Sequence, residues 1–245
     1  MTRINKYLAE CGICSRREAD KLVEQGKVKI NNQPALTGSQ VGENDVVEVN
    51  GKVLQHKSPK IVLAYYKPVG VTCTENDKHA KMPITKALQY KERLTYAGRL
   101  DQDSEGLIIM TNDGELIQRM MKASQYHEKE YLVKVHKEIT QEFINGLSKG
   151  VYLKELDQTT RPCIVEQIGK YTFRIILTQG LNRQIRRMCQ YFGYQVKGLK
   201  RVRVVNIELG KLKSGEYREI TGTEKEKLYQ LCGTGNLASD TAGKG

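Results

Sequence analysis

The 245-residue sequence predicts an α+β protein in which a small domain is followed by a larger one with a mainly antiparallel or mixed sheet. Strand-like and helix-like stretches follow one another irregularly, without the regular alternation that is typical of a doubly wound fold. Residues 51–60 are polar and include Gly, Ser and Pro, so we interpret them as a linker between residues 1–50 and residues 61–232. Residues 233–245 have Leu237 as their one large apolar side chain and are predicted to be disordered.

Two short helices are predicted in the small domain. Apolar side chains recur with helical spacing over residues 4–11, and Thr2 is expected to cap this helix. Ser15 and Glu18 have the spacing of a capping box, in which each side chain binds the backbone N–H of the other residue, so a second helix is expected to begin here. Basic residues are frequent in both helices, which therefore offer a surface for an anionic partner.

Strands are predicted where apolar and β-branched residues cluster between turn residues. The predicted strands cover residues 28–30, 46–49, 61–66, 71–74, 107–111, 130–135 and 171–177. Two helices are predicted in the larger domain, one capped by Thr140 and the other capped by Asn182 and ended by Gly193. Residues 75–83 are charged and are predicted to form a loop.

The chain is strongly basic, with 40 Lys and Arg against 28 Asp and Glu and a formal net charge of +12. The charge is concentrated in residues 178–213, where Glu208 is the single acidic residue. The basic residues of this stretch are Arg183, Arg186, Arg187, Lys197, Lys200, Arg201, Arg203, Lys211 and Lys213. Such a stripe is typical of phosphate binding, although a solvated basic face would give the same pattern.

No metal or cofactor is predicted. Cys11 and Cys14 have the spacing of one half of a zinc site, but no second Cys or His pair lies at a suitable distance. The sequence also contains no phosphate-binding loop and no dinucleotide-binding motif. Six cysteines without a signal peptide predict a reducing, cytoplasmic location, and no stretch is long and apolar enough to span a bilayer.

The segment between residues 96 and 107 concentrates candidate catalytic side chains. Arg99, Asp101 and Asp103 lie within five residues of one another, between two glycines at which the backbone can turn sharply. A carboxylate beside a guanidinium group stays ionised and oriented, which suits a nucleophile. The alternative interpretation is an Arg–Asp pair that only stabilises a turn.

The central motif of the RsuA-type RNA pseudouridine synthases resembles the segment Gly98-Arg99-Leu100-Asp101-Gln102-Asp103-Ser104-Glu105-Gly106-Leu107. Four further segments resemble this family in the same order, namely Tyr66-Lys67-Pro68-Val69-Gly70, Lys129-Glu130-Tyr131-Leu132-Val133, Gln184-Ile185-Arg186-Arg187-Met188 and Leu199-Lys200-Arg201. Residues 3–8 and 15–19 resemble an S4 RNA-binding domain, which RsuA-type synthases carry at this end. The resemblance implies the pseudouridine synthase fold and the conversion of uridine to pseudouridine in RNA without a cofactor.

The resemblance also implies roles for individual residues. Asp101 stands at the position of the catalytic aspartate, and Arg186 is expected to pair with it. Tyr131 is expected to stack on the target base and, in addition, to accept or deliver the C5 proton, while Leu199 completes the apolar wall of the base pocket. Further substrate contacts are expected from the basic residues Arg99, Lys67, Arg183, Arg187 and Arg201 in the larger domain and Arg3, Lys6, Arg16 and Arg17 in the small one.

The segments Leu181-Asn182-Arg183 and His127-Glu128-Lys129-Glu130-Tyr131 most resemble the RluF subgroup, which modifies 23S ribosomal RNA. The expected partner is therefore ribosomal RNA, bound by a monomer, with 16S ribosomal RNA and tRNA as alternative substrates. A non-catalytic ribosome-associated protein would explain the basic stripe but leaves the catalytic motif without a role. A retaining glycosidase would use Asp101 and Asp103 as its two carboxyl groups, but the charge of the chain argues against a neutral sugar substrate.

Overall fold

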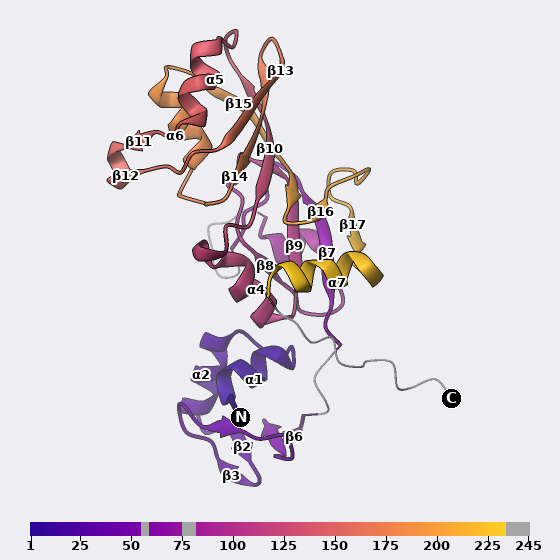
Figure 1. Cartoon of the computed structure of the whole chain (residues 1–245). Helices are drawn as coiled ribbons and strands as arrows, with labels where there is room; N and C mark the ends of the chain where they lie inside the picture. The colour runs from indigo at the N-terminus through magenta and orange to yellow at the C-terminus, as the bar shows by residue number, and fades with distance from the viewer. Residues whose placement is uncertain (55–58, 75–81, 234–245) are drawn as a thin grey trace. The chain divides into compact units, whose positions relative to one another are not determined.

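The computed structural model describes residues 1–54, 59–74 and 82–233 (Figure 1). The chain divides into a smaller unit, made of residues 1–61 with two short later segments, 90–94 and 112–114, and a larger unit that holds the remaining residues. The predicted tail beyond residue 233, the centre of the predicted linker and residues 75–81 of the predicted loop lie outside the described residues.

The smaller unit packs two helices against short antiparallel strands. Its elements are β1 (Thr2–Arg3), α1 (Ile4–Glu10), α2 (Arg16–Glu24), β2 (Val28–Ile30), β3 (Gln33–Pro34), β4 (Gln40–Val41), β5 (Val47–Val49) and β6 (Lys52–Val53). The strands form a four-stranded sheet in the order β3-β2-β5-β6 and a separate β1-β4 pair. The core of this unit is made of small and branched apolar side chains from both helices and from these strands, Ile4, Leu8 and Val28 among them.

The predicted capping box is confirmed, because the Glu18 backbone N–H donates to Ser15 Oγ at 3.3 Å and the Ser15 N–H donates to Glu18 Oε2 at 2.8 Å. The predicted cap by Thr2 is wrong. Thr2 lies in β1 and pairs with Val41, and α1 begins without a side-chain cap. A strand partner from a distant segment has therefore replaced the local capping interaction.

The larger unit is built on one mixed sheet. The strands of this unit are β7 (Val62–Lys67), β8 (Thr95–Ala97), β9 (Glu105–Thr111), β10 (Lys129–Val135), β11 (Tyr152–Leu153), β12 (Gln158–Thr159), β13 (Ile164–Gly169), β14 (Thr172–Leu177), β15 (Val196–Val204), β16 (Ile207–Glu208) and β17 (Tyr217–Glu219). Of these, β11 and β12 form a separate two-stranded sheet. The main sheet has the order β13-β14-β10-β15-β9-β7-β17, with β8 added to β9 and β16 to β15. In the described sheet every pairing is antiparallel except that of β9 with β15, so the predicted α+β class with a mixed sheet is confirmed.

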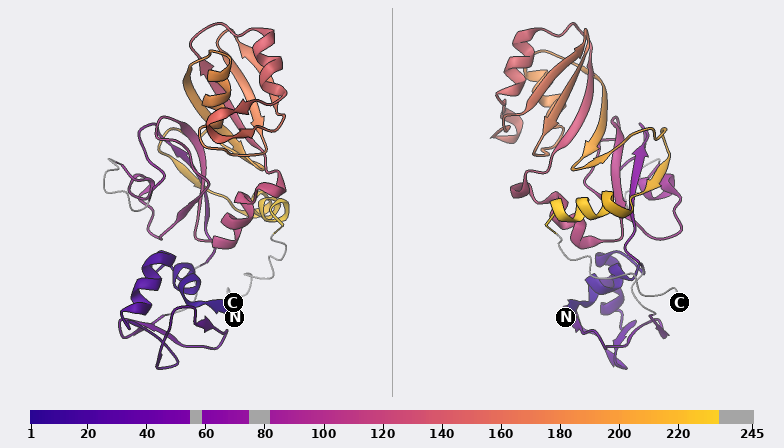
Figure 2. Two further views of the ribbon diagram at one scale, coloured as in Figure 1. Left: turned by 90° about the vertical axis from the view of Figure 1, so that its left-hand side faces the viewer. Right: turned by 45° about the vertical axis from the view of Figure 1, so that its right-hand side comes forward.

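Helices cover the two halves of this sheet. They are α3 (Ile84–Leu88), α4 (Gly114–Met121), α5 (Gln141–Ser148), α6 (Gln184–Tyr191) and α7 (Gly222–Leu231), with short 3-10 turns η1 (Ala123–Gln125) and η2 (Lys154–Leu156). Figures 1 and 2 show α5 and α6 side by side against the half formed by β13, β14, β10 and β15. This half has its own core, in which Phe143, Phe173 and Met188 are fully buried, and a second core joins β7 and β9 to α4 and α7.

Two further local predictions are wrong. Residues 71–74 do not form the predicted strand; Thr72 alone makes an isolated parallel β-bridge with Pro83, in which the Thr72 N–H donates to Met82 O at 3.0 Å. Asn182 does not cap α6; the helix follows Arg183, which has left-handed backbone angles, and Asn182 O accepts a hydrogen bond from Arg187. The predicted cap by Thr140 is confirmed, with a 3.2 Å bond from the Phe143 N–H.

The described part of the chain contains no helix that is long and apolar enough to cross a membrane. All six cysteines lie in this part, and no two of them form a disulfide.

Candidate active site

A loop of residues 98–104 connects β8 to β9, which pair as neighbouring antiparallel strands. The Ser104 N–H donates to Asp101 O at 3.1 Å, so the segment that carries the two aspartates is closed into a tight turn. Its outer side is held by the Gly70 N–H, which donates to Gln102 O at 2.8 Å. The loop is therefore fixed to the sheet at both ends and to the bend after β7.

The end of this loop is tied to β15 by a close backbone approach. Gly106 lies opposite Arg201 in the parallel pairing, has φ +109°, and leaves no space for a Cβ, which would overlap the backbone of Arg201. The buried Arg201 side chain donates from Nε to Leu107 O at 2.7 Å and from Nη1 to Arg99 O at 3.5 Å. Arg201 was expected to contact substrate; it lines the cavity described below, but these hydrogen bonds give it an anchoring role for the loop.

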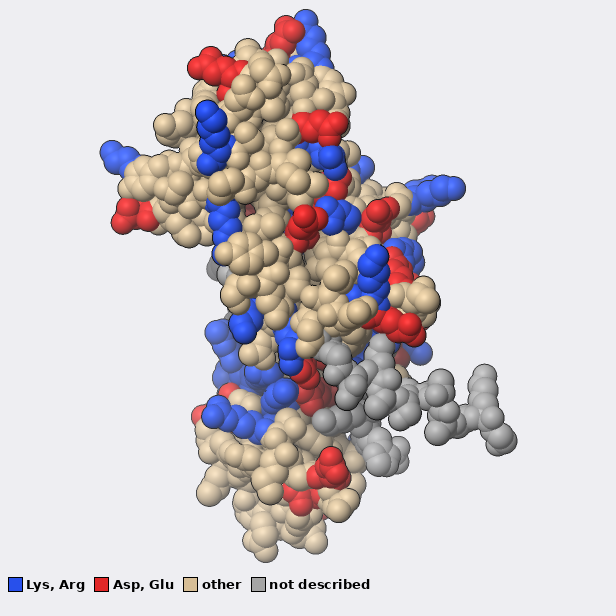
Figure 3. Space-filling model, in the orientation of Figure 1, with Lys and Arg blue, Asp and Glu red and all other residues tan. Residues whose placement is uncertain are grey.

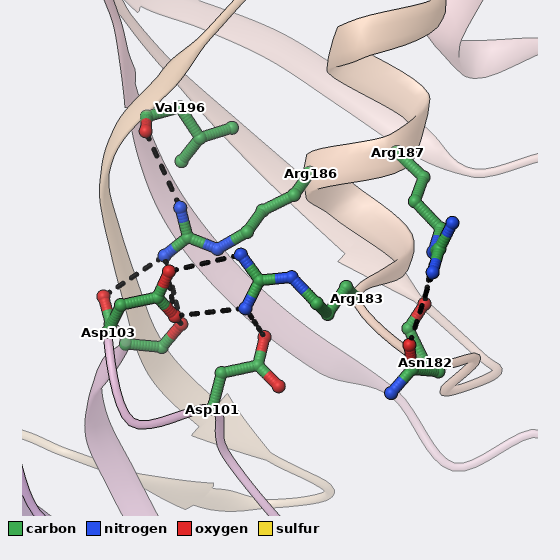
Figure 4. Close-up of polar contacts among 8 residues, drawn as sticks. Asp101, Asp103, Asn182, Arg183, Arg186, Arg187 and Val196 are labelled. Carbon is green, nitrogen blue, oxygen red and sulfur yellow. Dashed lines mark hydrogen bonds and ion pairs between the residues drawn. The ribbon is translucent and has the colours of Figure 1, made fainter.

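Two arginines hold the two aspartates, namely Arg186 in α6 and Arg183 just before the helix (Figure 4). Arg183 spans both carboxylates, with 3.4 Å between Nη1 and Asp101 Oδ2 and 3.1 Å between Nη2 and Asp103 Oδ2. Arg186 Nη2 lies 3.2 Å from Asp103 Oδ1 and also donates to Asp103 O at 3.0 Å. This arrangement corrects the expectation that Arg186 pairs with Asp101, because it is Arg183 that contacts Asp101.

The two arginines stand in different environments. Arg186 is largely buried, and besides Asp103 it donates to Ser104 Oγ at 3.3 Å and to Val196 O at 3.4 Å, so it joins the loop to β15. The Arg183 side chain is 42% exposed, and its polar contacts within the described residues are with the carboxylates of Asp101 and Asp103. Arg183 can therefore leave the aspartates for an arriving phosphate at a smaller cost than Arg186 can.

The aspartates differ in how strongly they are held. Partial burial alone would raise the pKa of Asp103, but the hydrogen bond from Arg183 and the positive charge of Arg186 outweigh burial and lower the pKa below its ordinary value. Asp101 has one ion pair, with the exposed Arg183, and its second carboxylate oxygen points away from that pair in Figure 4. Asp103 is thus held by two arginines, whereas Asp101 is held by Arg183 alone among the described residues.

A cavity of about 460 Å³ opens beside Asp101. Tyr131 of β10 and Leu199 of β15 form part of its wall, and Leu100 from the loop adds a third apolar surface. Tyr131 and Leu199 come from paired strands, in which Tyr131 lies opposite Arg201 and Leu199 opposite Val133. The structure therefore brings together three residues that the sequence assigned to one site, Asp101, Tyr131 and Leu199.

Lys67 does not take the place that was expected for it. Its side chain is completely buried, and Nζ donates to Pro68 O and to Val71 O, both at 2.8 Å. Burial lowers the pKa of Lys67. Neighbouring negative groups, Asp101 among them, raise it, but burial has the larger effect. Lys67 closes the bend after β7, and its side chain does not reach the protein surface.

Two polar residues of the cavity were missed by sequence reasoning. Lys129 lines the cavity, its Nζ donates to His127 O at 3.2 Å, and burial together with the charges of Arg201 and Arg161 lowers its pKa. Gln179 also lines the cavity, and its Oε1 accepts a hydrogen bond from the Arg161 N–H. Lys129 stands inside the matched segment 129–133, so its position was visible, but nothing local showed that its side chain faces the cavity.

The remaining predicted contacts are spread over three surfaces. Arg99 is exposed at the rim of the cavity, and Arg187 lies on the other side of α6 from the aspartates, where Nε donates to Asn182 O at 3.0 Å (Figure 4). In the smaller unit Arg3, Arg16 and Arg17 are exposed, and Lys6 lies 3.6 Å from Glu10. Figure 3 shows Lys and Arg side chains gathered over the end of this unit that α1 and α2 form.

Comparison with known proteins gives consistent results. The RNA pseudouridylate synthase family model matches residues 61–191, and the S4 domain model matches residues 2–47. The chain is 46% identical over 231 residues to the dual-specificity RNA pseudouridine synthase RluF of Escherichia coli (strain K12), covering 94% of this chain and 79% of that protein. It is 34% identical over 246 residues to the ribosomal large subunit pseudouridine synthase B of Bacillus subtilis (strain 168), covering 97% and 100%.

A crystal structure of a pseudouridylate synthase has the same architecture, with a TM-score of 0.68 and 28% identity over 93% of this chain and all of that one. The matched family model covers β7 through α6, which includes the aspartate loop, Tyr131 and the two clamping arginines. The chain is therefore an enzyme of the RNA pseudouridylate synthase family, with an N-terminal S4 domain.

Proposed function

We propose that this enzyme isomerises a specific uridine of 23S ribosomal RNA and that Asp101 is its nucleophile. The observation that carries the proposal is the placement of Asp101 at a cavity whose walls include Tyr131, Leu199 and Leu100. An apolar wall that includes an aromatic ring suits a nucleobase that has left its stack, and the carboxylate beside it suits attack on the sugar of the same nucleotide.

The reaction needs no group that enters or leaves. The Asp101 carboxylate attacks C1′, and the bond from C1′ to N1 breaks with its electron pair remaining on the uracil; in the alternative route Asp101 first removes the proton from C2′ and returns it to C2′ as the new bond to C1′ forms. The uracil turns inside the cavity until C5 faces C1′, the new C–C bond forms, and Asp101 is released. The proton on C5 is then lost and N1 gains one, so that atoms and charge balance.

Tyr131 is proposed both to stack on the target base and to move the C5 proton. Its ring replaces part of the stacking that the uracil loses when it leaves the RNA helix, a loss of a few kcal/mol. Its hydroxyl is the candidate group for moving the C5 proton. Leu199 closes the pocket and excludes water from the displaced uracil, while Arg186 holds the loop that carries Asp101.

The choice of RNA is supported by the relatives. One of them is named for the large ribosomal subunit and another for dual RNA specificity. We therefore propose 23S ribosomal RNA as the main substrate, and tRNA as the class in which to look for a second one. The exposed arginines of the S4 unit would contact phosphates of the same RNA, in a monomeric cytoplasmic enzyme.

Tritium release from RNA labelled at uridine C5 tests the reaction, and carbodiimide treatment followed by primer extension maps the modified position. Asp101→Asn should abolish turnover and leave RNA affinity within a few-fold of wild type, because the amide keeps the shape of the carboxylate but is not a nucleophile. Asp103→Asn is the matched control and should cost much less. More than about one hundredth of the wild-type rate in Asp101→Asn would remove Asp101 from the proposed role.

A further inference from the structure

The far side of α6 carries a second hollow that the reaction does not use. It measures about 400 Å³ and lies between α6, which contributes Arg187, Gln190 and Tyr191, and the β11–η2 segment, which contributes Tyr152 and Leu153. The two tyrosines are unusually accessible for large aromatic side chains, with Tyr191 66% and Tyr152 51% exposed. This volume falls within the usual range of small-ligand sites.

Both tyrosines are exposed, but contacts with neighbouring residues fix the positions of their rings. The Tyr152 hydroxyl donates to Asp157 Oδ1 at 2.7 Å, which fixes the direction of the ring. Tyr191 packs edge-on against Phe192, with 5.0 Å between ring centroids and an angle of 78° between planes. Phe192 in turn packs against Phe143 of the core, so the Tyr191 ring rests on a rigid base. Its accessible surface is thus a preformed aromatic platform.

The hollow places basic side chains beside its exposed aromatic rings. Arg187 and Lys154 line it with a single carboxylate, Glu155, which is paired with Arg187. Exposed aromatic rings beside cations are the arrangement by which proteins bind unpaired nucleotides, with the bases stacked on the rings and the phosphates near the basic groups.

The hollow is linked to the candidate active site through residues that line neighbouring hollows. A third hollow, lined by Arg183, Arg186 and Gln190, lies between them around α6. It shares Arg183 with the active-site cavity and Gln190 with the tyrosine hollow. A single strand that places one nucleotide at Asp101 can therefore follow α6 past these basic side chains to the tyrosines.

We propose that Tyr191 and Tyr152 form a second nucleobase site, which stacks an unpaired base of the RNA strand that carries the target uridine. This site extends the proposed function, because its ligand is the substrate RNA. Stacking on a tyrosine depends little on base identity, so the site selects for a single-stranded neighbour of the target and not for a sequence.

The absence of tryptophan in the chain offers a direct test. Tyr191→Trp, made in the full-length chain, introduces one indole, whose emission should be quenched by an oligouridylate of about twelve nucleotides, a length within the usual range of site sizes. Inorganic polyphosphate, which has the charge but no base, should leave the emission unchanged. Tyr171→Trp is the control, because Tyr171 is exposed but lines none of the three hollows.

Affinity for the same oligonucleotide gives the second measurement. Tyr191→Ala and Tyr152→Ala should each weaken binding about tenfold, whereas Tyr191→Phe should bind like wild type because the stacking face is kept. Equal quenching of the Tyr171→Trp control, a response to polyphosphate, alanine effects smaller than about twofold, or no binding of the oligonucleotide by the wild type would overturn the proposal.

The Asp101→Asn variant separates this site from the reaction. Quenching of Tyr191→Trp should be the same with and without Asp101→Asn, since the hollow does not include Asp101. If the wild-type enzyme released no tritium from labelled RNA but the oligouridylate still quenched Tyr191→Trp, the proposed reaction would be wrong and the nucleobase site would stand. If tritium were released but quenching were absent, the reverse would hold.

Discussion

Replacing Gly106 by alanine should disturb the catalytic loop more than replacing Gly70 or Gly180 by alanine. Gly106 has φ +109°, where an L side chain is strained, and the new Cβ would collide with the backbone of Arg201 in the paired strand β15. Neither strand can yield freely, because the Arg201 side chain holds Leu107 O at 2.7 Å. The collision must therefore separate β9 from β15 at the base of the loop.

Two other glycines separate strain from collision. Gly70 has φ +91° but open space around its Cβ position, so Gly70→Ala should cost only the strain, about 1–2 kcal/mol. Gly180 has no left-handed φ and also has open space around its Cβ position. Gly180→Ala should therefore change the free energy of unfolding by less than about 1 kcal/mol. Gly106→Ala adds overpacking of about 1–3 kcal/mol to the strain and should cost roughly 2–5 kcal/mol in all.

Thermal unfolding of the three full-length variants, followed by circular dichroism, measures these differences. For a chain of this size 1 kcal/mol corresponds to about 2–4 °C, so the midpoint should fall by roughly 10 °C for Gly106→Ala and roughly 4 °C for Gly70→Ala. The fraction of Gly106→Ala that stays folded should also react up to about a hundredfold more slowly, because Asp101 is displaced. A Gly106→Ala variant as stable as Gly70→Ala would refute the account of how the loop is anchored.

Three further changes test the division of roles. The pKa of Asp103 is lowered in the folded protein, so its carboxylate stabilises the fold above the unfolded-state pKa near 4, and this stabilisation is lost as the pH falls through the lower folded-state pKa. Asp103→Asn removes this pH dependence, so the free energies of unfolding of wild type and variant should converge in acid. Tyr131→Phe keeps the stacking face, so RNA should bind normally while a rearranged but unfinished base accumulates; normal turnover would leave stacking as the only role of Tyr131. Deleting residues 1–50 should weaken binding and make the slope of log affinity against log salt shallower by about 0.7–0.9 per lost phosphate contact, and an unchanged slope would place those contacts in the larger unit.

Sequence signals succeeded where the deciding interaction is local. The Ser15–Glu18 capping box and the Thr140 cap both join residues three positions apart, and both are present. The cap expected from Thr2 failed because its backbone pairs with Val41, a partner that no local pattern indicates. Residues 71–74 look like a strand because they are apolar and β-branched, but their pairing with a distant segment is limited to one bridge, between Thr72 and Pro83, and does not extend into a ladder.

The candidate site was predictable in its members but not in its pairings. Motif resemblance placed Asp101, Tyr131 and Leu199 in one site, and they line one cavity. The partner of Asp101 depended on where α6 starts: Arg183 adopts left-handed backbone angles just before the helix and thereby reaches both aspartates across about 80 residues of sequence. Neither the left-handed residue nor the distance it bridges leaves a mark in the local sequence.

The anchoring of the aspartate loop by Arg201 also sets the order in which the enzyme is completed during its synthesis. Leu107 and Arg201 are 94 residues apart, and a ribosome that adds about 5–20 residues per second needs roughly 5–20 s to cover that distance. The edge strand β17, which pairs with β7, is made later still. The nascent chain therefore exposes Asp101 before Arg183, Arg186 and Arg201 have been made, and catalytic competence arrives only after these residues have emerged.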